Sequence, residues 1–273
     1  MPEFPIESLD DPRLDAYRDL KHASSKWQQT FVAEGEKLVL RLLDSGCRTE
    51  SILCTAAARD RLGQRPPADV SIYVTSTSLI SRLIGFQFHR GVLACGLRPV
   101  QQNLESLLAS NTAEKRLLIV LCPEIRDPAN LGTIIRTAAA FGAVCLVAGL
   151  AGTQPFSRRV LRTSMGTVLQ LPIIQTEVWT EIFETLHRFE FDTIATVIDP
   201  AAESLSSASR ASRVALLLGN EDTGLPGELC NKCRRQVRVP MAGGVDSLNV
   251  AVAAGIIMHH FADGSGGLAH QAT

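Results

Sequence analysis

Two kinds of hydrophobic pattern alternate along this chain. Short, nearly continuous apolar runs recur, such as LLIVLCP over 117–123 and AVCLVAG over 143–149. Between them lie stretches in which apolar residues repeat every three to four positions, as at 131, 134, 135 and 138. The runs are typical of strands in a parallel sheet buried on both faces, and the periodic stretches are typical of amphipathic helices. The pattern therefore predicts an α/β fold.

Residues 21–100 are predicted to form a small α/β domain. The stretch FVAEGEKLVLRLLDSG has apolar residues at 38, 39, 42 and 43 and closes on Gly46, which predicts an amphipathic helix with a glycine stop. STSLISRLIG predicts a second helix, and short strands are predicted at SILCT, VSIYVTS and HRGVLACGL. We expect residues 1–20, which are acidic, to form a leader with a turn or a short helix.

The second block of the chain predicts the larger domain, over 117–263. Its predicted strands are LLIVLCP, AVCLVAG, FDTIATVID, RVALLLGNE and RQVRVPM, and its predicted helices are NLGTIIRTAAAFG and SLNVAVAAGIIMHHF. Near-continuous apolar strands that alternate with helices indicate a mainly parallel sheet. The polar residues 101–116 are the predicted linker between the domains, and the end of the chain, 264–273, is predicted to be disordered.

Charge and composition narrow the range of partners. The chain has 27 Lys and Arg against 28 Asp and Glu, a net charge of −1, which excludes a generic polyanion-binding protein. Any contact with nucleic acid must therefore be local. No apolar run reaches the ~18 residues of a membrane span, and the acidic N-terminus lacks the apolar core of a secretory signal. We expect a cytoplasmic protein with no membrane partner.

The seven cysteines indicate a reducing compartment rather than disulfide bonds. Most stand alone in apolar runs, and their number is odd. Cys230 and Cys233 form a CxxC pair in GELCNKCRR. A structural zinc site needs four ligands and usually a second such pair, which the sequence lacks, so we expect no metal centre. A structural role is favoured for the pair, with a redox or metal-binding role as the alternative.

Polar turns that contain glycine follow three of the predicted strands: RDPANLG, GNEDTGLPG and MAGGVDSLNV. In open α/β sheets, ligands bind beyond the carboxyl ends of the strands, where these turns are expected. Each turn also has a purely structural explanation, because Asn130 or Ser247 can cap a helix and glycines allow tight turns. Capping does not explain why Arg136, Glu221 and Asn249 are present together.

Several enzyme classes are excluded by motifs that the sequence lacks. No strand-to-helix turn carries the dinucleotide fingerprint GxGxxG or the phosphate-binding loop GxxxxGK[ST]. This argues against nicotinamide enzymes, P-loop nucleotidases and the common glycine-rich methyltransferase fold. The metal-binding HExxH and the nucleophile elbow GxSxG are absent too. The three turns therefore point to a different class of site.

The same turns resemble the three motifs of the SpoU (TrmH-like) RNA ribose methyltransferase family, in the SPOUT superfamily. DPANLGTIIRTAAAFGA resembles the first motif, ALLLGNEDTGLP the second and VPMAGGVDSLNVAVAAGIIMHH the third. Between the first two, QPFSRRVLRTSMGTVLQLPI resembles the family's SxxVxRxSxG-type stretch. The motifs occur in the family's order, and the resemblance covers about residues 21–262, with FVAEGEKLVLRLLDSG and FHRGVLA in the first domain.

This resemblance implies a particular fold, cofactor and reaction. The second domain would contain a deep trefoil knot, a rare exception to the rule that chains do not thread loops. S-adenosylmethionine would bind in the knot, and the protein would be a homodimer with the active site near the subunit interface. The implied reaction is methyl transfer to a ribose 2′-hydroxyl of ribosomal RNA, because the first domain resembles that of ribosomal RNA members. A transfer RNA substrate and a non-catalytic RNA-binding scaffold are the alternatives.

The resemblance also assigns the catalytic residues: Asn130, Arg136, Glu221, Ser247 and Asn249. Arg136 matches the family's essential arginine. A ribose hydroxyl must lose its proton as it attacks, so the protein has to supply proton removal and positioning. Because a guanidinium stays protonated, we expect Arg136 to clamp the RNA phosphate and stabilise the developing alkoxide rather than to act as the base. Glu221 is expected to hydrogen-bond within the site or to order its loop.

The remaining expected contacts concern the cofactor and the RNA. Cofactor-binding positions implied by the resemblance are Leu218, Gly219, Val239, Met241 and Leu248. Expected RNA contacts are Arg158, Arg159, Arg162, Lys21, Lys26 and Arg90, with a second basic cluster at Arg234, Arg235 and Arg238. The second motif has Asp222 where the family commonly has glycine, and the third has Gly244 where some relatives carry a basic or polar residue. These departures concern loop geometry and RNA specificity.

Overall fold

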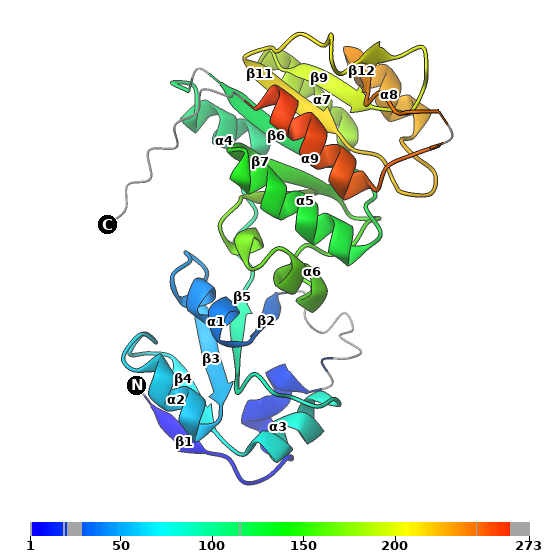
Figure 1. Cartoon of the computed structure of the whole chain (residues 1–273). Helices are drawn as coiled ribbons and strands as arrows, with labels where there is room; N and C mark the ends of the chain where they lie inside the picture. Colours follow the sequence, from blue (N-terminus) through cyan, green and yellow to red (C-terminus); the bar gives the residue numbers. More distant parts are fainter. Residues whose placement is uncertain (1, 19, 21–28, 115, 244, 263–273) are drawn as a thin grey trace. The chain divides into compact units, whose positions relative to one another are not determined.

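The computed structural model describes residues 2–18, 20, 29–114, 116–243 and 245–262 (Figure 1). The chain divides into two compact units, each with its own sheet and core. The first unit comprises Met1–Val100 together with Phe156–Gln170, and the second comprises Gln101–Pro155 together with Leu171–Thr273. The expected boundary near residue 100 coincides with a boundary between the units. The expected second domain differs from the second unit, because 156–170 pack with the first unit.

The first unit has a mixed sheet with the strand order β1-β4-β3-β5-β2. Its strands are β1 (Glu3–Pro5), β2 (Thr30–Glu34), β3 (Thr49–Cys54), β4 (Ser71–Val74) and β5 (Val92–Leu97). Strands β1, β4 and β3 run parallel, whereas β5 is antiparallel to both of its neighbours. Its helices are α1 (Glu36–Leu43), α2 (Ala56–Leu62), α3 (Thr77–Ile84) and, from later in the chain, α6 (Arg158–Thr163).

The expected leader over 1–20 is part of the first unit. Residues 3–5 form β1, which pairs with β4, and the 3-10 helix η1 (Pro12–Tyr17) follows. Leu14 and Tyr17 are fully buried in the core of the unit. The Tyr17 hydroxyl shares a 2.8 Å hydrogen bond with the hydroxyl of Ser51 on β3. Glu3, Glu7, Asp10 and Asp15 are exposed near these buried anchors, so an acidic composition does not show that the segment packs into the unit.

The predicted helix over FVAEGEKLVLRLLDSG is wrong in its first part. Residues 30–34 form β2, which pairs with β5, and the helix α1 begins only at Glu36. Gly35 separates the two elements with φ of +92°, a backbone conformation that continues neither strand nor helix and that favours glycine. The aromatic and β-branched residues Phe31 and Val32 favour the strand over the helix.

The inserted segment 156–170 is held in the first unit by apolar side chains. Phe156, Val160 and Leu161 are buried, and the rings of Phe156 and Phe31 lie 5.6 Å apart between centroids. The segment continues from α6 into a short 3-10 helix, η4 (Thr167–Leu169). A segment that lies between the first and second motifs thus belongs to the first unit and contributes to its core.

Gly96 on β5 provides a test of this core. A Cβ atom at this position would lie 2.7 Å from the Cζ of Phe31 and 3.2 Å from the Cδ1 of Leu42. We expect Gly96→Ala to lower the free energy of unfolding by about 1–3 kcal/mol, because the core must move to admit the methyl group. Urea unfolding measures the change. Gly46→Ala is the control, since a Cβ there meets nothing within 4 Å, and equal losses in both variants would contradict the packing described.

The second unit has a seven-stranded sheet with the strand order β10-β12-β9-β11-β6-β7-β8. Every strand pair in it is parallel, as the apolar runs predict. Its strands are β6 (Leu117–Cys122), β7 (Ala143–Gly149), β8 (Ile173–Thr176), β9 (Asp192–Thr196), β10 (Glu203–Ser204), β11 (Arg213–Leu217) and β12 (Arg235–Arg238).

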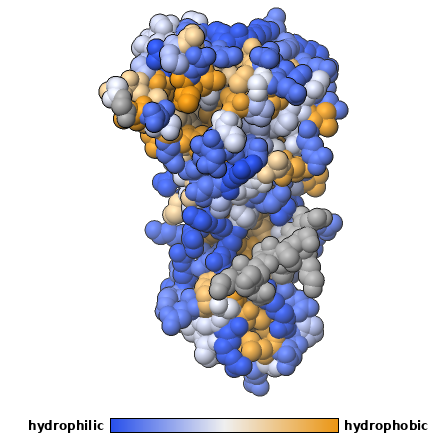
Figure 2. Space-filling view, turned by 90° about the vertical axis from the view of Figure 1, so that its right-hand side faces the viewer, coloured by the Kyte–Doolittle hydropathy of each residue, from blue (hydrophilic) through white to orange (hydrophobic). Residues whose placement is uncertain are grey.

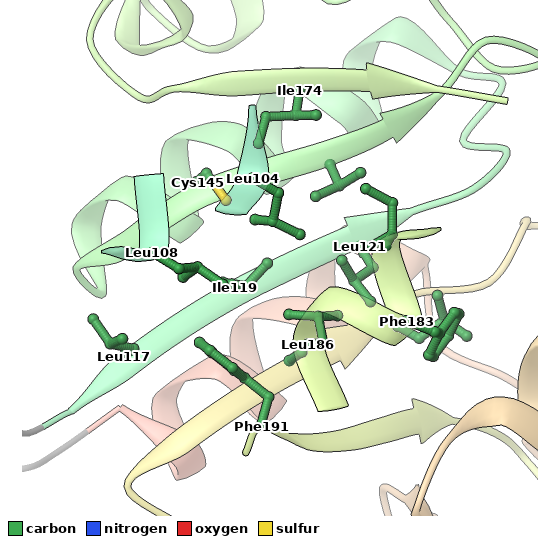
Figure 3. Packing of buried hydrophobic residues seen from close by; sticks show 14 of the residues in the cluster. Leu104, Leu108, Leu117, Ile119, Leu121, Cys145, Ile174, Phe183, Leu186 and Phe191 are labelled. Atoms are coloured by element: carbon green, nitrogen blue, oxygen red, sulfur yellow. The ribbon is translucent and has the colours of Figure 1, made fainter. Parts of the chain in front are cut away.

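Helices cover both faces of this sheet. They are α4 (Leu104–Ser110), α5 (Pro128–Ala140), α7 (Trp179–Arg188), α8 (Gly227–Lys232) and α9 (Val250–Phe261). Leu117, Ile119 and Leu121 of β6 pack with α4 and α7 (Figure 3). Because side chains alternate along a strand, the other buried residues of β6 face the opposite side, where α5 and α9 lie next to each other (Figure 1).

The structure changes the interpretation of the expected linker, and it does not describe the expected disordered end. The expected linker 101–116 contains α4, whose Leu104 and Leu108 are buried in the core of the second unit, so most of it is a structural element of that unit. The expected disordered end, 264–273, lies outside the described residues. No helix among those described combines the length and the apolar character that crossing a membrane requires.

Candidate active site

The first of the three candidate turns connects β6 to α5. Asp127 is the N-cap of α5, and its carboxylate accepts a hydrogen bond from the backbone N–H of Ala129 at 2.9 Å. Pro128 follows at the first helical position, where it is favoured because no backbone donor is lost there. The capping role considered for Asn130 is therefore filled by Asp127. The side chain of Asn130, in the first turn of α5, is available for other contacts.

The second turn follows β11 and is organised by Asn220. This residue is 7% exposed, and its side-chain amide donates to the carbonyl of Glu124 at 2.8 Å. Its side-chain oxygen accepts from the backbone N–H groups of Asp222 at 2.8 Å and Thr223 at 3.2 Å. Asn220 is not among the residues predicted from the sequence, although it directly precedes Glu221 in GNEDTG. It ties the second turn to the first and presents Glu221 at the surface.

The third turn leads from β12 into α9. Asn249 is the N-cap of α9, accepting hydrogen bonds from the backbone N–H groups of Ala251 at 2.9 Å and Val252 at 3.3 Å. The capping role considered for Ser247 therefore belongs to Asn249. Ser247 lies two residues earlier and is exposed. Its hydroxyl forms no hydrogen bond with the described residues.

Three of the predicted catalytic side chains meet in one row. The Nδ2 of Asn249 donates to the Oδ1 of Asn130 at 3.0 Å, and the Nδ2 of Asn130 donates to the Oε1 of Glu221 at 2.6 Å. These residues are far apart in sequence and come from all three turns. Asn130 uses one donor and one acceptor within the row, whereas Asn249 donates to the row and accepts from the backbone of α9, so the orientation of both amides is fixed. The row ends in an exposed carboxylate, which can accept hydrogen bonds from hydroxyl groups.

Arg136 does not join this row. It lies on α5 six residues after Asn130, which corresponds to about 9 Å along the helix and a different direction around it. The side chain is exposed and forms no ion pair with the described residues. Within one chain, the structure therefore leaves the predicted phosphate clamp apart from the other catalytic candidates.

Two groups near the row, Arg126 and Cys122, have shifted pKa values. Arg126 hydrogen-bonds to the carboxylate of Glu124 at 2.9 Å through its Nε, and this carboxylate raises the pKa of Arg126. Burial raises the pKa of the Cys122 thiol at the end of β6, and the negative charge of Glu221 adds to the effect. Cys122 is therefore a neutral core residue and not a nucleophile.

The predicted cofactor residues lie on the second and third turns. Leu218 is buried, and its backbone N–H donates to the carbonyl of Leu121 at 2.9 Å. A Cβ on Gly219 would lie 2.9 Å from the backbone of Gly224, so the two sides of the second turn touch there. Val239, Met241 and Leu248 are half-buried on the third turn. The half-buried apolar side chains suit an adenine ring.

The predicted RNA contacts fall on the first unit. Arg162 and Arg90 are exposed, and Arg90 is 3.8 Å from the carboxylate of Glu34. Arg158 lies 3.6 Å from the same carboxylate and stacks 4.4 Å from the ring centre of Phe86, so its guanidinium is already engaged. Arg159 is exposed on α6. Lys21 and Lys26 lie outside the described residues.

The second basic cluster is partly structural. Arg235 donates to the carboxylate of Asp192 at 2.6 Å and to that of Glu203 at 3.1 Å, which ties β12 to its neighbours. Arg234 is exposed, and Arg238 is half-buried at the end of β12.

The CxxC pair packs against the core of the second unit. Burial raises the pKa of Cys230, and it raises the pKa of Cys233 to about 12. Both thiols therefore lack the depressed pKa of a redox-active pair. The described residues contain no cluster of three or more His, Cys, Asp or Glu side chains arranged to bind a metal ion.

The second unit is thus an α/β domain whose candidate site, the row of polar side chains, lies on the turns that follow parallel strands. The model of the SpoU rRNA Methylase family matches residues 117–259, which include all three turns. The chain belongs to this family. A Mycobacterium tuberculosis protein named as an uncharacterized tRNA/rRNA methyltransferase is 32% identical over 92% of this chain and 88% of its own length.

Two further comparisons extend over nearly the whole chain. The 23S rRNA (guanosine(2553)-2′-O)-methyltransferase RlmP of Bacillus subtilis is 29% identical over 93% of this chain and 98% of its own length. The crystal structure of an AdoMet-bound rRNA methyltransferase from Sinorhizobium meliloti superposes with a TM-score of 0.79 at 29% identity. It covers 94% of this chain and 97% of that one. The similarity thus includes both units.

Proposed function

We propose that this protein transfers a methyl group from S-adenosylmethionine to a ribose 2′-hydroxyl of structured RNA, with ribosomal RNA as the substrate. The observation that carries the proposal is the hydrogen-bonded row from Asn249 through Asn130 to Glu221. It joins the three family motifs at one place. The relatives RlmP and RlmB, the latter from Acinetobacter baylyi and 30% identical over 71% of this chain, are named 23S rRNA 2′-O-methyltransferases.

The second and third turns would hold the cofactor. Half-buried Val239, Met241 and Leu248 offer apolar contacts for the adenine, and the backbone near Leu218 and Gly219 offers hydrogen bonds. S-adenosylmethionine supplies an electrophilic methyl group on its sulfonium. The protein's own task is to place the ribose oxygen in line with that group and to exclude other orientations.

The row of amides would position the reacting ribose. Asn130 and Asn249 are held by their mutual hydrogen bond, and Ser247 is exposed two residues before Asn249 on the third turn. Glu221 accepts hydrogen bonds from hydroxyl groups at the end of the row. Arg136 binds the adjacent phosphate and stabilises the negative charge that develops on the ribose oxygen during methyl transfer. A preorganised set of this kind lowers the barrier without large rearrangement.

A homodimer would bring Arg136 to the row. Within one chain Arg136 stands apart from Asn130, so a second subunit is the natural source of the arginine. Val252 and Ile256, 52% and 40% exposed, form an apolar stripe on α9, as expected of a helix that packs against a partner. On the face drawn in Figure 2, hydrophobic residues gather in a patch on the second unit, in the upper part of the view. The family's trefoil knot is part of the same proposal.

Methyl transfer to defined RNA pools tests the proposal. The full-length protein is incubated with labelled S-adenosylmethionine and unmodified ribosomal or transfer RNA, and any labelled nucleotide is mapped by mass spectrometry. We expect a ribose-methylated nucleotide in ribosomal RNA and none with Glu221→Gln. If only transfer RNA were labelled, transfer RNA rather than ribosomal RNA would be the substrate. Cofactor binding without transfer to either pool would favour a non-catalytic scaffold. A cytoplasmic location is proposed on the ground of the substrate alone.

A further inference from the structure

The first unit contains a cavity of about 400 Å³ that the proposed reaction does not use. Its walls come from the β2–α1 turn, from Arg90 before β5 and from the inserted segment 156–170. The lining residues include Glu34, Lys37, Leu38, Arg90, Arg162 and Met165. Cavities of this size hold small ligands, and one nucleotide falls within the range.

Glu34 is an acceptor without a donor. Its side chain is 8% exposed, and neither carboxylate oxygen accepts a hydrogen bond from the described residues. The nearest cations are Arg158 at 3.6 Å and Arg90 at 3.8 Å, which neutralise its charge without forming a hydrogen bond. A buried carboxylate normally has hydrogen-bond donors, because leaving it without them costs free energy. A ligand in the cavity can supply them.

Met165 presents an apolar surface in the same cavity. Its side chain is 38% exposed although its backbone has φ of +54°, a conformation that residues other than glycine rarely adopt. Arg41 on α1 donates a hydrogen bond to the Met165 carbonyl, and the N–H of Gly166 donates to the carbonyl of Leu161 at 2.9 Å. The surrounding structure therefore holds an exposed methionine in an unfavourable conformation, which is typical of functional positions.

The rim of the cavity carries positive charge. Lys37 and Arg162 are both exposed, and neither forms an ion pair with the described residues. The acidic neighbour Glu36 is engaged by Arg61 at 2.8 Å. Cations at the rim, apolar contacts on the wall and one buried acceptor are the three contacts that an unstacked nucleotide requires for its phosphates, base face and base edge.

We propose that this cavity binds one unstacked nucleotide of the RNA, separate from the nucleotide that is methylated. The base packs against Met165 and Leu38, and its amino group donates a hydrogen bond to Glu34. Lys37 and Arg162 bind the flanking phosphates. The inference rests on RNA as the substrate and adds a determinant of sequence specificity in the first unit. Bases with an exocyclic amino group, namely guanine, adenine and cytosine, are selected over uracil.

Methionine methyl NMR tests this assignment on the full-length protein. The chain has four methionines, and three of them report on different places: Met165 on the cavity, Met241 on the proposed cofactor turn and Met258 on the core. The probes are the four nucleoside 5′-monophosphates, inorganic phosphate and S-adenosylmethionine. We expect saturable shifts of Met165 with GMP, AMP or CMP, and binding of UMP about tenfold weaker, as one base-edge contact provides. Met258 should not respond.

Variants separate the contributions to binding. Lys37→Ala should weaken all monophosphates alike, whereas Glu34→Gln should remove the preference over UMP. The control is Arg82→Ala, an exposed cation in the same unit that does not line the cavity, and it should bind as the wild type does. The Met258 signal reports whether each variant is folded, and Lys37→Ala, at an exposed position, carries the test alone if Glu34→Gln does not fold.

Three results would overturn the inference. They are a Met165 signal that responds to no monophosphate, equal binding of UMP and the other three, and full reproduction of the shifts by inorganic phosphate. A shift of Met241 with S-adenosylmethionine in the same sample, together with methyl transfer to RNA, would then show that the proposed function stands without the cavity. If Met241 did not shift with S-adenosylmethionine and no methyl group were transferred to RNA, the proposed function itself would be wrong.

Discussion

Arg136→Ala is expected to reduce methyl transfer by about 10²–10³-fold or more, the range seen when a group that stabilises developing negative charge is removed. Cofactor affinity should change little, because Arg136 is exposed on α5 and is not among the proposed cofactor-binding residues of the second and third turns. Arg136→Lys keeps the charge but loses the fork that binds two phosphate oxygens, so partial activity is expected. Single-turnover transfer and equilibrium binding of S-adenosylmethionine measure the two effects.

A matched control uses another exposed arginine of the same unit. Arg210→Ala should retain wild-type turnover, since Arg210 is exposed and precedes β11, whereas the second turn follows the opposite end of that strand. If Arg136→Ala turned over at the wild-type rate, its proposed role would be wrong. If instead its cofactor affinity fell in proportion to transfer, Arg136 would act on cofactor binding rather than on the ribose.

The second large effect is expected at Asn249, where two functions can be separated. Asn249→Asp keeps a side-chain oxygen for the N–H groups of Ala251 and Val252, and a negative charge is favourable at a helix N-terminus. It removes the donor to the Oδ1 of Asn130 and places a carboxylate there. We expect transfer to fall by about 10²-fold or more because the row loses its orientation, while thermal stability stays nearly unchanged.

Asn249→Ala is the contrasting variant. It removes both the cap and the donor, so a loss of about 1 kcal/mol of stability is expected in addition to the loss of transfer. Thermal unfolding and single-turnover transfer distinguish the two variants. Full activity in Asn249→Asp would show that the hydrogen-bonded row has no part in catalysis.

Mixing the two inactive variants tests the shared site. If the arginine and the row come from different subunits, a mixed dimer of Arg136→Ala and Asn249→Asp contains one intact site and one doubly altered site. Random mixing should then restore about a quarter of the wild-type activity. A site built within one chain predicts no recovery. Light scattering on the same samples establishes whether a dimer is present.

The candidate site shows how much of its composition can be predicted from residue types and their order in the sequence. Asn130, Glu221 and Asn249 were chosen from three separate turns by motif resemblance, and the structure joins them by hydrogen bonds of 2.6 and 3.0 Å. Which residue caps each helix was not predictable in the same way. Asp127 and Asn249 cap α5 and α9, because capping depends on the backbone angles where the helix begins, and several neighbouring side chains qualify by type.

The amino-acid sequence is sufficient to predict the parallel sheet of the second unit, the helices α5 and α9 and the three turns that carry the candidate site, but it does not predict α7 or β8. Continuous apolar runs and helical periodicity are local properties, so they can be read without knowing what packs against them. Tertiary packing was needed to show that residues 30–34 form a strand, that α4 belongs to the second unit and that 156–170 belong to the first. Those outcomes depend on partners distant in sequence, such as β5 for β2 and Phe31 for Phe156, because the free energy of burial is shared between segments that local pattern cannot pair.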